Sequence, residues 1–492
     1  MEEYKAKFID FLLKTGALKV EGDFSLKSKR LSPWFVNIGD FNDGETSGAL
    51  GEFYADSILN SGVDFDLLYG IPDKGREIAA VTAVEMNRKG KNVPRFSTRK
   101  EAKTYGESSN LSQAEKMKAW IIGRAPKNGQ SIVQMDDVFT AGDAKYQAIE
   151  ILKSLGEYKL PLLSIAVDRM EVGIDGKGAI EEYEQKTGTK VVSILNASDI
   201  ISYLDEFLQK SKCIFKMSGE VFMNETQLRE SIKRMGNYLR VYGTEKIRKY
   251  IEQNRGKLEQ KIIDADRSVI PACDVETIEE FEKLVGETAE VKGIGGYKVG
   301  FELGLGYSLK KVVETAKKYT NKPVIYDHQK AGTDIPDTGK NFANVCKKAG
   351  VDAVILFPQA GPETERAWIY HCLDKGLNVI VGGRMTHPAY AVSEGGFITD
   401  EGALEMYRIA ARAGITNFVV PGNKPEVIKQ VKDIIEAEGI SPIFYAPGFI
   451  AQGGSISDAA KVAGDRFHGI VGRGIYKAAN MKEAAIEHTS KL

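Results

Sequence analysis

Several features that mark specialised classes of protein are missing from this sequence. Its four cysteines lie far apart and form no C-x-x-C pair, which excludes a zinc ribbon and disfavours a disulfide scaffold. No apolar run approaches the roughly 18 residues of a membrane-spanning helix. The 67 basic and 68 acidic residues leave a net charge of -1, so no overall field attracts nucleic acid or an anionic membrane. Local groups therefore have to bind any anionic ligand.

The beginning of the chain also lacks the pattern of a signal peptide. Residues 1–16, MEEYKAKFIDFLLKTG, carry charges within a helical pattern and predict an amphipathic helix. The cytoplasm is therefore the expected location, with neither a membrane nor nucleic acid as a partner. The 492 residues are 42% hydrophobic and 27% charged, a composition typical of a globular chain with roughly two to four domains.

From about residue 268 onward, short β-forming runs alternate with helical patterns. Strands that alternate with helices pair in parallel, and continuously apolar strands indicate a sheet covered on both faces. Eight such units in about 225 residues predict a closed (β/α)8 TIM barrel, which we assign to residues 266–492. The runs are 268–273, 297–301, 323–326, 352–357, 378–383, 417–422, 442–448 and 469–473.

Residues 1–210 are predicted to form an open α/β sheet, with strands over 65–72, 131–137, 162–169 and 190–195. Residues 211–265 differ, because a plausible helix cap at Asn224 is followed by apolar residues at helical spacing. These residues are Leu228, Ile232, Met235 and Leu239. Lysine and arginine are interleaved with glutamate in this region, which favours a helical connector with a solvated charged face over a nucleic-acid site.

Residues 131–152 run from a predicted strand through Asp136 and Asp137 and a small-residue turn into a helix. Backbone N–H groups of such a turn can close on an anion at the helix N-terminus. The adjacent carboxylates suit a ribose diol or a metal-bridged pyrophosphate, although the bare pattern also fits an ordinary turn. The stretch resembles the phosphoribosyl-diphosphate motif of type I phosphoribosyltransferases. The resemblance implies the two aspartates at the ribose and a 5'-phosphate cradle at residues 140–144, with Thr140, Ala141 and Gly142.

Other segments resemble orotate phosphoribosyltransferase within that group. They are FSLKSKRLSPWFVNIG (24–39), GIPDKG (70–75), STRKEAKTYGESS (97–109) and VDRMEVG (167–173). The resemblance implies cations and Mg2+ that stabilise the charge on a leaving pyrophosphate, with orotate and phosphoribosyl diphosphate as substrates. The implied contacts are Lys27 and Phe35 beside pyrophosphate and base, Lys74 at the pyrophosphate, Arg99, Lys100 and Lys103 in a mobile catalytic loop, and Arg169 at the orotate ring.

The chain departs from the family pattern at a few positions. Thr104 and Tyr105 stand where the family carries Asp-His, and Asp73 replaces a common tyrosine. Asp143 adds a negative charge to the phosphate loop, unless it faces the helix N-terminus, where a carboxylate is favourable. These departures leave a second interpretation open, in which the first domain is a non-catalytic sensor of phosphoribosyl diphosphate or a scaffold.

Active sites of (β/α)8 barrels lie at the carboxyl ends of the strands. Asp274 closes the first predicted strand, Lys298 lies in the second, Asp327 ends the third, and Lys330 and Asp334 follow. Their mutual pairing offsets the cost of burying charge, although a salt-bridge network that only rims the barrel is an alternative. Glycine-rich segments after strands seven and eight, with one arginine, indicate a phosphate site. A phosphate monoester is therefore the expected substrate.

This half resembles orotidine 5'-phosphate decarboxylase, through ACDV, YKVGF, YDHQKAGTDIPDT, MTHP, APGFIAQGG and VGRGIY in that order. Both intervals of the family's Asp-x-Lys-x-x-Asp-Ile signature are one residue longer here. The resemblance implies that Asp327 lies near the substrate carboxylate, while Lys330 stabilises the carbanion and protonates it without a cofactor. It also implies a homodimer, in which Asp334, Ile335 and Thr338 come from the neighbouring subunit. Further implied contacts are Asp274, Thr386, Pro447, Gln452, Gly453, Gly472 and Arg473.

A chain that joins these two resembles the bifunctional UMP synthases, which convert orotate to orotidine 5'-phosphate and then to UMP. A sister group of sugar-phosphate decarboxylases or aldolases that use Mg2+ is the rival for the barrel. His387, in the loop after strand five, and His468, expected before strand eight, are assigned structural roles. No residues have metal-ligand spacing, so Mg2+ is expected only through the diphosphate of the substrate. A homodimer or a higher homo-oligomer is expected.

Overall fold

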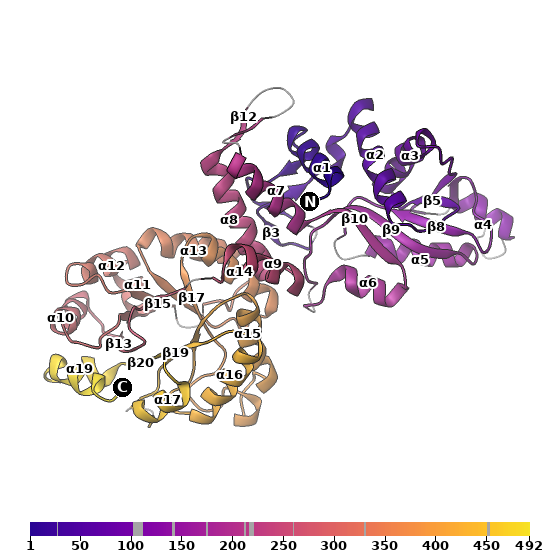
Figure 1. Cartoon of the computed structure of the whole chain (residues 1–492). Coiled ribbons are helices and arrows are strands. Elements are labelled where there is room, and N and C mark those ends of the chain that lie inside the picture. Colours follow the sequence, from indigo (N-terminus) through magenta and orange to yellow (C-terminus); the bar gives the residue numbers. More distant parts are fainter. Residues whose placement is uncertain are drawn as a thin grey trace. The chain divides into compact units, whose positions relative to one another are not determined.

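The chain folds into two compact α/β units (Figure 1). One unit contains Met1–Leu239 and Gly243–Ile251, and the other contains Arg240–Tyr242 and Glu252–Leu492. The computed structural model describes residues 1–26, 28–101, 112–139, 143–173, 176–210, 213–215, 221–258, 260–328, 331–449 and 453–492.

An open six-stranded sheet forms the centre of the first unit, as the sequence predicts. Its strand order is β10-β9-β8-β5-β6-β7. Only β7 is antiparallel to its neighbour, β6. The strands are β5 (Leu67–Gly70), β6 (Arg95–Thr98), β7 (Ile121–Gly123), β8 (Ser131–Met135), β9 (Lys159–Asp168) and β10 (Lys190–Asn196). The sequence pattern did not indicate β6 and β7. Both strands are short, and Phe96 is the only apolar residue of β6.

Helices cover both faces of this sheet, with α2 and α3 above it and α5 and α6 below it in Figure 1. Two short antiparallel pairs, β1 with β4 and β2 with β3, accompany the sheet. The helices are α1 (Glu3–Lys14), η1 (Ile38–Asp40), α2 (Gly44–Asn60), α3 (Lys74–Arg88), α4 (Gln113–Trp120), α5 (Asp143–Leu155), α6 (Ala179–Thr187) and α7 (Ala197–Lys210). The short strands are β1 (Leu18–Lys19), β2 (Phe24–Ser25), β3 (Leu31–Ser32) and β4 (Phe35–Val36).

Two glycines bring the start of α3 against the ends of the central strands. A Cβ atom at Gly70 would lie 2.3 Å from the Gly75 carbonyl oxygen, and one at Gly75 would lie 2.2 Å from the Met135 carbonyl oxygen. No side chain fits at such distances, so only glycine permits this approach. The first residue of α3, Lys74, therefore begins beside the turn that follows β8.

The helices expected after residue 222 are α8 (Glu225–Tyr242) and α9 (Glu245–Arg255). Asn224 caps α8 as predicted, since Asn224 Oδ1 accepts from the Gln227 N–H at 3.0 Å while Gln227 Oε1 accepts from the Asn224 N–H at 3.0 Å. The four apolar residues at helical spacing, Leu228, Ile232, Met235 and Leu239, are buried. A hairpin that the sequence did not indicate, β11 (Cys213–Phe215) and β12 (Val221–Asn224), precedes α8.

Eight parallel strands close into a barrel in the second unit, which confirms the predicted fold. Isoleucine and other apolar side chains from alternate positions fill its interior. The strands are β13 (Arg267–Cys273), β14 (Tyr297–Val299), β15 (Val324–Asp327), β16 (Ala353–Leu356), β17 (Asn378–Gly382), β18 (Asn417–Val419), β19 (Ile443–Ala446) and β20 (Phe467–Val471).

The helices of this unit surround the barrel (Figure 1). They are α10 (Ile278–Thr288), α11 (Phe301–Tyr307), α12 (Leu309–Lys317), α13 (Thr338–Ala349), α14 (Pro362–Asp374), η3 (Val392–Glu394), α15 (Asp400–Arg412), α16 (Pro425–Ala437), α17 (Ile456–Ala463), α18 (Arg473–Tyr476) and α19 (Met481–Thr489).

His468 lies within β20, so the expectation that it precedes the last strand is wrong. The strand begins two residues earlier than its apolar run suggested, because His468 is itself buried and pairs in register with Ser268 of β13. Its Nδ1 lies 2.8 Å from Ser268 Oγ, and its ring is 4.8 Å from that of Tyr445. The Tyr445 hydroxyl donates to Asn417 Oδ1 at 3.2 Å. A polar network thus occupies the barrel near the amino-terminal ends of its strands.

Acid should destabilise the barrel through His468. Burial lowers the pKa of His468 to about 4, whereas an unfolded histidine titrates near 6.5. Between these values the unfolded chain binds a proton that the folded chain does not, so stability falls as pH falls through this window. We expect His468 to account for a loss of about 2 kcal/mol between pH 7 and pH 5, measured by urea unfolding.

His468→Gln, which cannot titrate, should lose less stability than the wild type over the same pH step. His387→Gln provides the matched control, because His387 is exposed and its replacement should leave the pH dependence unchanged. Equal losses in the wild type and His468→Gln would contradict this account.

Candidate active sites

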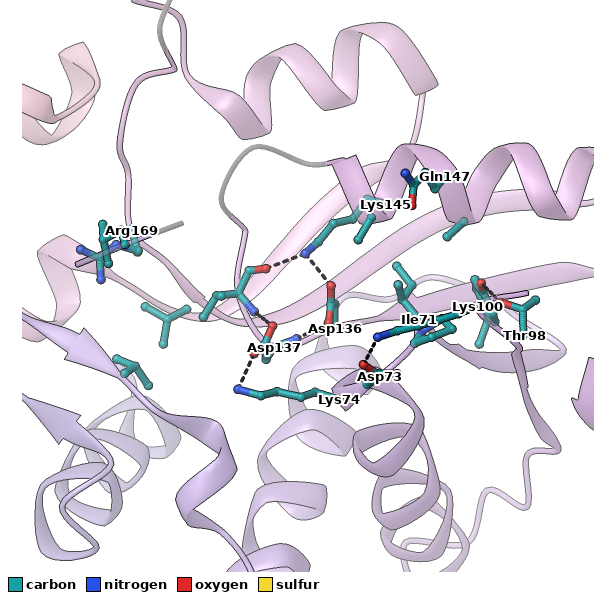
Figure 2. A pocket seen from close by; sticks show the side chains of 18 of the residues that line it. Ile71, Asp73, Lys74, Thr98, Lys100, Asp136, Asp137, Lys145, Gln147 and Arg169 are labelled. Carbon is teal, nitrogen blue, oxygen red and sulfur yellow. Dashed lines mark hydrogen bonds and ion pairs between the residues drawn. The ribbon is translucent and has the colours of Figure 1, made fainter. Parts of the chain in front are cut away.

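A cavity of about 850 Å3 opens at the carboxyl ends of β5, β8 and β9 in the first unit (Figure 2). Strand β5 lies between β6 and β8. The chain adds β6 on one side of β5 and later adds β8 on the other side, so the strand order reverses at β5. Open α/β sheets bind ligands at such a switch point. The predicted residues that line the cavity are Phe35, Lys74, Arg99, Lys100, Asp136, Asp137 and Arg169.

The two aspartates after β8 are each paired with a lysine. Asp136 Oδ2 lies 2.5 Å from Lys145 Nζ, and Asp137 Oδ2 lies 3.1 Å from Lys74 Nζ (Figure 2). Their other oxygens accept backbone bonds, Asp136 Oδ1 from the Asp137 N–H at 2.9 Å and Asp137 Oδ1 from the Val138 N–H at 2.7 Å. Burial raises the pKa of Asp136, and Lys145 opposes that shift. The cavity therefore contains two ion pairs side by side.

Sequence reasoning missed Lys145. It lies on the same side of α5 as Ala148, Ile149 and Leu152, which are all buried. The one signal in the sequence is that Lys145 shares a helical spacing with apolar residues. A lysine on the apolar side of a helix indicates a paired charge, because lysine is rarely fully buried unless it is paired. Its partner could not be read from the pattern, since packing of α5 onto the sheet brings the two side chains together.

Arg169 lines the cavity with its guanidinium already engaged. Its Nε donates to Glu171 Oε1 at 2.8 Å, and Nη2 donates to Ser32 Oγ at 2.8 Å. The guanidinium carbon lies 3.9 Å from the centre of the Trp34 ring, a cation–π contact. Lys100 forms an ion pair with Asp73 at the opposite side of the cavity (Figure 2). Lys27, Lys103, Thr104, Tyr105, Thr140, Ala141 and Gly142 lie outside the described residues, as does the Asp143 side chain.

Three of the predicted charges meet at the mouth of the barrel. Lys298 Nζ lies 3.4 Å from Asp274 Oδ1 and 3.2 Å from Asp327 Oδ2. The lysine side chain is only 8% exposed. Burial lowers the pKa of Lys298, but the two carboxylates outweigh this effect and the pKa is raised overall. Lys298 is therefore an ammonium ion held between two acids. Lys330 lies outside the described residues.

Asp334 lies in a turn, and α13 begins four residues later at Thr338. Helix α14 holds the backbone of this turn. Thr364 Oγ1 donates to the Asp334 carbonyl oxygen at 2.9 Å, and Trp368 Nε1 donates to the Ile335 carbonyl oxygen at 3.1 Å. The Ile335 side chain is 58% exposed. Asp334 forms no ion pair within the part of the chain that the structure describes. Thr364 and Trp368 were not selected from the sequence.

The remaining predicted contacts follow later strands of the barrel. Thr386 follows β17, and its carbonyl oxygen accepts from Asn423 Nδ2 at 3.1 Å. Pro447 follows β19, and its carbonyl oxygen accepts from the Gly422 N–H at 2.8 Å. After β20, Gly472 precedes α18 and the exposed Arg473 begins it. Gly453 follows the β19 loop with a φ of 82°, and Gln452 lies outside the described residues.

The two halves of the chain are similar to different enzymes. Over 207 residues the chain is 42% identical to the orotate phosphoribosyltransferase of Enterobacter sp. (strain 638), covering 42% of this chain and 91% of that relative. Over 244 residues it is 36% identical to the orotate phosphoribosyltransferase of Colwellia psychrerythraea (strain 34H), covering 49% of this chain and 100% of that relative. Residues 267–487 match the family described as "Orotidine 5'-phosphate decarboxylase / HUMPS family".

A solved structure of orotidine 5'-monophosphate decarboxylase from Methanocaldococcus jannaschii aligns with a TM-score of 0.41 and 28% sequence identity, covering 46% of this chain and 98% of that one.

Within the described residues, no helix is both long enough and apolar enough to cross a membrane.

Removing the Lys298 ammonium should destabilise the barrel. Lys298→Met would remove the ammonium that lies between Asp274 and Asp327, at an expected cost of roughly 3 kcal/mol, because removing one partner of a buried ion pair leaves the other charge less well compensated. Urea unfolding at neutral pH measures this loss.

Lys310→Met is the matched control for this substitution. Lys310 pairs with Glu314 on the surface, where both side chains are more than 60% exposed, and such pairs contribute little to stability. If Lys298→Met costs no more than Lys310→Met, the buried cluster does not stabilise the barrel.

Proposed function

The chain belongs to the orotate phosphoribosyltransferase family in its first half and carries an orotidine 5'-phosphate decarboxylase / HUMPS domain over residues 267–487, and from this we propose that it is a bifunctional UMP synthase. The first unit joins orotate to phosphoribosyl diphosphate, and the barrel decarboxylates the orotidine 5'-phosphate that results. The observation that carries this proposal is the presence, in one chain, of two domains whose reactions are consecutive.

In the first reaction, Asp136 and Asp137 accept hydrogen bonds from the ribose hydroxyl groups of phosphoribosyl diphosphate. Their carboxylate oxygens are also the donors that Mg2+ prefers, and the ion, when bound with the substrate diphosphate, would neutralise charge on the leaving group. Lys74, Arg99 and Lys100 supply further positive charge to that group. The observation in support is that all five side chains line one cavity.

The same reaction assigns roles to the remaining predicted residues of this unit. Phe35 and Arg169 border the flat base. Lys103 approaches the pyrophosphate from the loop 97–109, and Lys27 approaches it from the segment 24–39. Residues 140–142 would cradle the 5'-phosphate through their N–H groups before α5.

In the second reaction, the carboxylate of orotidine 5'-phosphate lies beside Asp327. The bond between the ring carbon and the carboxyl carbon breaks, CO2 leaves, and the electron pair stays on the ring carbon. The Lys330 ammonium stabilises that pair and gives it a proton. Lys298, paired with Asp274 and Asp327, keeps the charges around this carbon in alternating order, and no cofactor takes part.

The rest of the barrel mouth binds the nucleotide away from the reacting carbon. Thr386 faces the pyrimidine, and Pro447 borders the loop that follows β19. The phosphate is bound by Gln452, Gly453, Gly472 and Arg473, of which Arg473 supplies a charged donor.

We propose a homodimer in which Asp334, Ile335 and Thr338 reach the barrel site of the neighbouring subunit. The exposed Ile335 side chain and the backbone bonds from α14 support this, because they present a fixed apolar tip to a partner. We place the enzyme in the cytoplasm. Cys273, Cys346 and Cys372 are free thiols, as is usual in a reducing compartment.

One observation favours a second function for the first unit. Asp73 forms an ion pair with Lys100, and this pair competes with the substrate for a cation that the transferase reaction needs. If the lysine stays paired with Asp73, the unit would only sense phosphoribosyl diphosphate or act as a scaffold. Steady-state consumption of orotate by the full chain excludes this alternative, whereas binding of phosphoribosyl diphosphate without turnover supports it.

A coupled assay with two separation-of-function variants tests both activities. The wild-type chain should convert orotate and phosphoribosyl diphosphate to UMP. Lys330→Ala should stop at orotidine 5'-phosphate, because the proton donor is gone. Asp136→Asn combined with Asp137→Asn should lose transfer but still decarboxylate added orotidine 5'-phosphate. Decarboxylation by Lys330→Ala within about tenfold of the wild type would count against the assignment.

The same assay with EDTA separates the decarboxylase from the Mg2+-dependent sister group. Transfer should cease in EDTA, whereas decarboxylation of added orotidine 5'-phosphate should persist. Loss of both activities in EDTA would instead favour the sister group for the barrel.

Mixing of inactive subunits tests whether the barrel site is shared. Lys330→Ala and Asp334→Ala chains should each be nearly inactive, but a heterodimer has one site with both lesions and one with neither. After random exchange, half of the dimers are mixed, so activity should approach about a quarter of the wild type. A mixture that stays inactive despite demonstrated exchange would place Asp334 in its own chain's site.

A further inference from the structure

Most of α8 and α9, which the sequence assigned to a connector, belongs to the first unit. In the turn between the two helices, the Thr244 N–H donates to the Met170 carbonyl oxygen at 2.8 Å. The neighbouring residue, Gly243, forms an antiparallel β-bridge with Glu171. These contacts attach the connector to the segment that directly follows Arg169 in the sequence.

The turn between α8 and α9 is closely packed. A Cβ atom at Gly243 would lie 2.2 Å from the Leu239 carbonyl oxygen and 2.4 Å from Ile247 Cγ2, so only glycine fits there. The Gly243 carbonyl oxygen accepts from Arg248 Nη1 at 3.1 Å. The Thr244 N–H is therefore presented to Met170 from a turn of defined geometry.

Met170 has a backbone conformation that a residue with a side chain rarely adopts. Its φ is 53°, in the left-handed region, and such a residue persists only where its surroundings hold it. The Met170 N–H donates to Asp168 Oδ1 at 2.7 Å, and the Met170 carbonyl oxygen accepts from Thr244. One of these bonds comes from the end of β9, and the other comes from the connector.

The turn at Met170 brings the Glu171 carboxylate back onto Arg169. Arg169 Nε donates to Glu171 Oε1 at 2.8 Å, and the two side chains are 6% and 13% exposed. A bond between side chains two positions apart depends on the backbone between them, so a change at Met170 would move the acid away from the guanidinium. The location of the Arg169 guanidinium therefore depends on the bond from Thr244.

Helix α8 also contacts the segment that leads to Phe35. Arg234 Nη1 donates to the Gly22 carbonyl oxygen at 3.0 Å, and Arg234 Nη2 lies 2.5 Å from Asp23 Oδ1. Strand β2 begins at the next residue, Phe24, whose ring stacks on that of Phe35 with 5.9 Å between the centroids. Phe35 lines the cavity. The connector thus contacts the segments of both residues that we assign to the flat base.

We propose that Thr244 is a positioning residue for the transferase reaction, whose N–H fixes the turn at Met170 and thereby holds the Arg169 guanidinium in place for orotate. This role rests on the proposed function of the first unit. The contacts of the connector reach the base side of the cavity, whereas the two aspartates after β8 are paired with lysines of α3 and α5. The effect should therefore fall on orotate and leave phosphoribosyl diphosphate binding unchanged.

Thr244→Pro in the full chain removes the N–H that bonds to Met170. The preceding residue, Gly243, is extended at φ -77° and ψ 156°, which is the conformation favoured before proline. The KM for orotate should rise about tenfold with kcat unchanged, because one hydrogen bond that holds Arg169 for binding is lost. The KM for phosphoribosyl diphosphate should equal that of the wild type. A fall in kcat with both KM values unchanged would indicate a merely structural role and overturn the proposal.

Two matched controls separate the lost bond from the other effects of a proline. Thr244→Ala loses the hydroxyl group, as Thr244→Pro does, but keeps the N–H. Glu245→Pro places a proline at the first residue of α9, where proline is favoured, and also keeps the Thr244 N–H. Both controls should have the wild-type KM for orotate. A KM raised as much in either control as in Thr244→Pro would contradict the role of the N–H.

A second substitution on the same path tests whether the effect passes through Arg169. Glu171→Met removes the carboxylate that holds the guanidinium and should also raise the KM for orotate. In the double variant with Thr244→Pro, the KM should rise by less than the product of the two separate factors, because both changes act on one side chain. Factors that multiply fully would contradict the proposed path.

Binding and the second activity show that each variant is folded. Calorimetric binding of phosphoribosyl diphosphate with Mg2+ reports on the first unit, and decarboxylation of added orotidine 5'-phosphate reports on the barrel. If Thr244→Pro does not fold, Arg234→Met is measured in the same way, and it should raise the KM for orotate alone because it releases the segment before β2. An unchanged KM for orotate in that variant would overturn the proposal.

The wild-type chain distinguishes failure of this role from failure of the proposed function. A wild-type chain that neither binds nor turns over orotate contradicts the proposed function and the role of Thr244 with it. A wild-type chain that turns over orotate, together with a folded Thr244→Pro chain of unchanged KM for orotate, contradicts the role of Thr244 alone.

Discussion

A carboxylate that is buried at the end of a strand needs a cation or a set of hydrogen-bond donors beside it, because an unpaired buried charge is far more costly than a paired one. Both units meet this requirement in the same way. In the open sheet, Lys145 and Lys74 accompany Asp136 and Asp137. In the barrel, Lys298 lies between Asp274 and Asp327. The glycines at the start of α3 and the packing of α5 are arranged so that these pairs can form.

The architecture was largely accessible from the sequence. Eight apolar runs separated by helical patterns are enough to specify a closed barrel, since parallel strands must be covered on both faces. The strands β6, β7, β11 and β12 were missed. They lie outside the regular alternation of apolar runs and helical patterns that identified the equally short barrel strands, such as β14 and β18. His468 was misplaced by a related effect. A polar residue that hydrogen-bonds inside the barrel interrupts the apolar pattern by which strands are recognised.

The candidate sites were predictable in part. Residues that carry a local pattern, such as Asp136 and Asp137 after a strand, were found, and they do line a cavity. Residues whose role depends on contact with another helix or strand were not found. Lys145 meets Asp136 only because α5 packs beside β8, and Thr364 and Trp368 meet the turn at Asp334 only because α14 lies beside α13. Such pairings are set by tertiary packing, about which one stretch of sequence carries no information.

The ion pair between Asp73 and Lys100 differs from the buried pairs, because its two side chains are 67% and 68% exposed. Dissolved ions screen such a pair strongly. Low ionic strength would therefore strengthen two opposing effects at once, the attraction of a polyanion to Lys100 and the hold of Asp73 on the same lysine. If Lys100 contacts the substrate as proposed, the Asp73 carboxylate competes with the substrate for this lysine, and binding would depend less on salt than the number of cations around the cavity suggests.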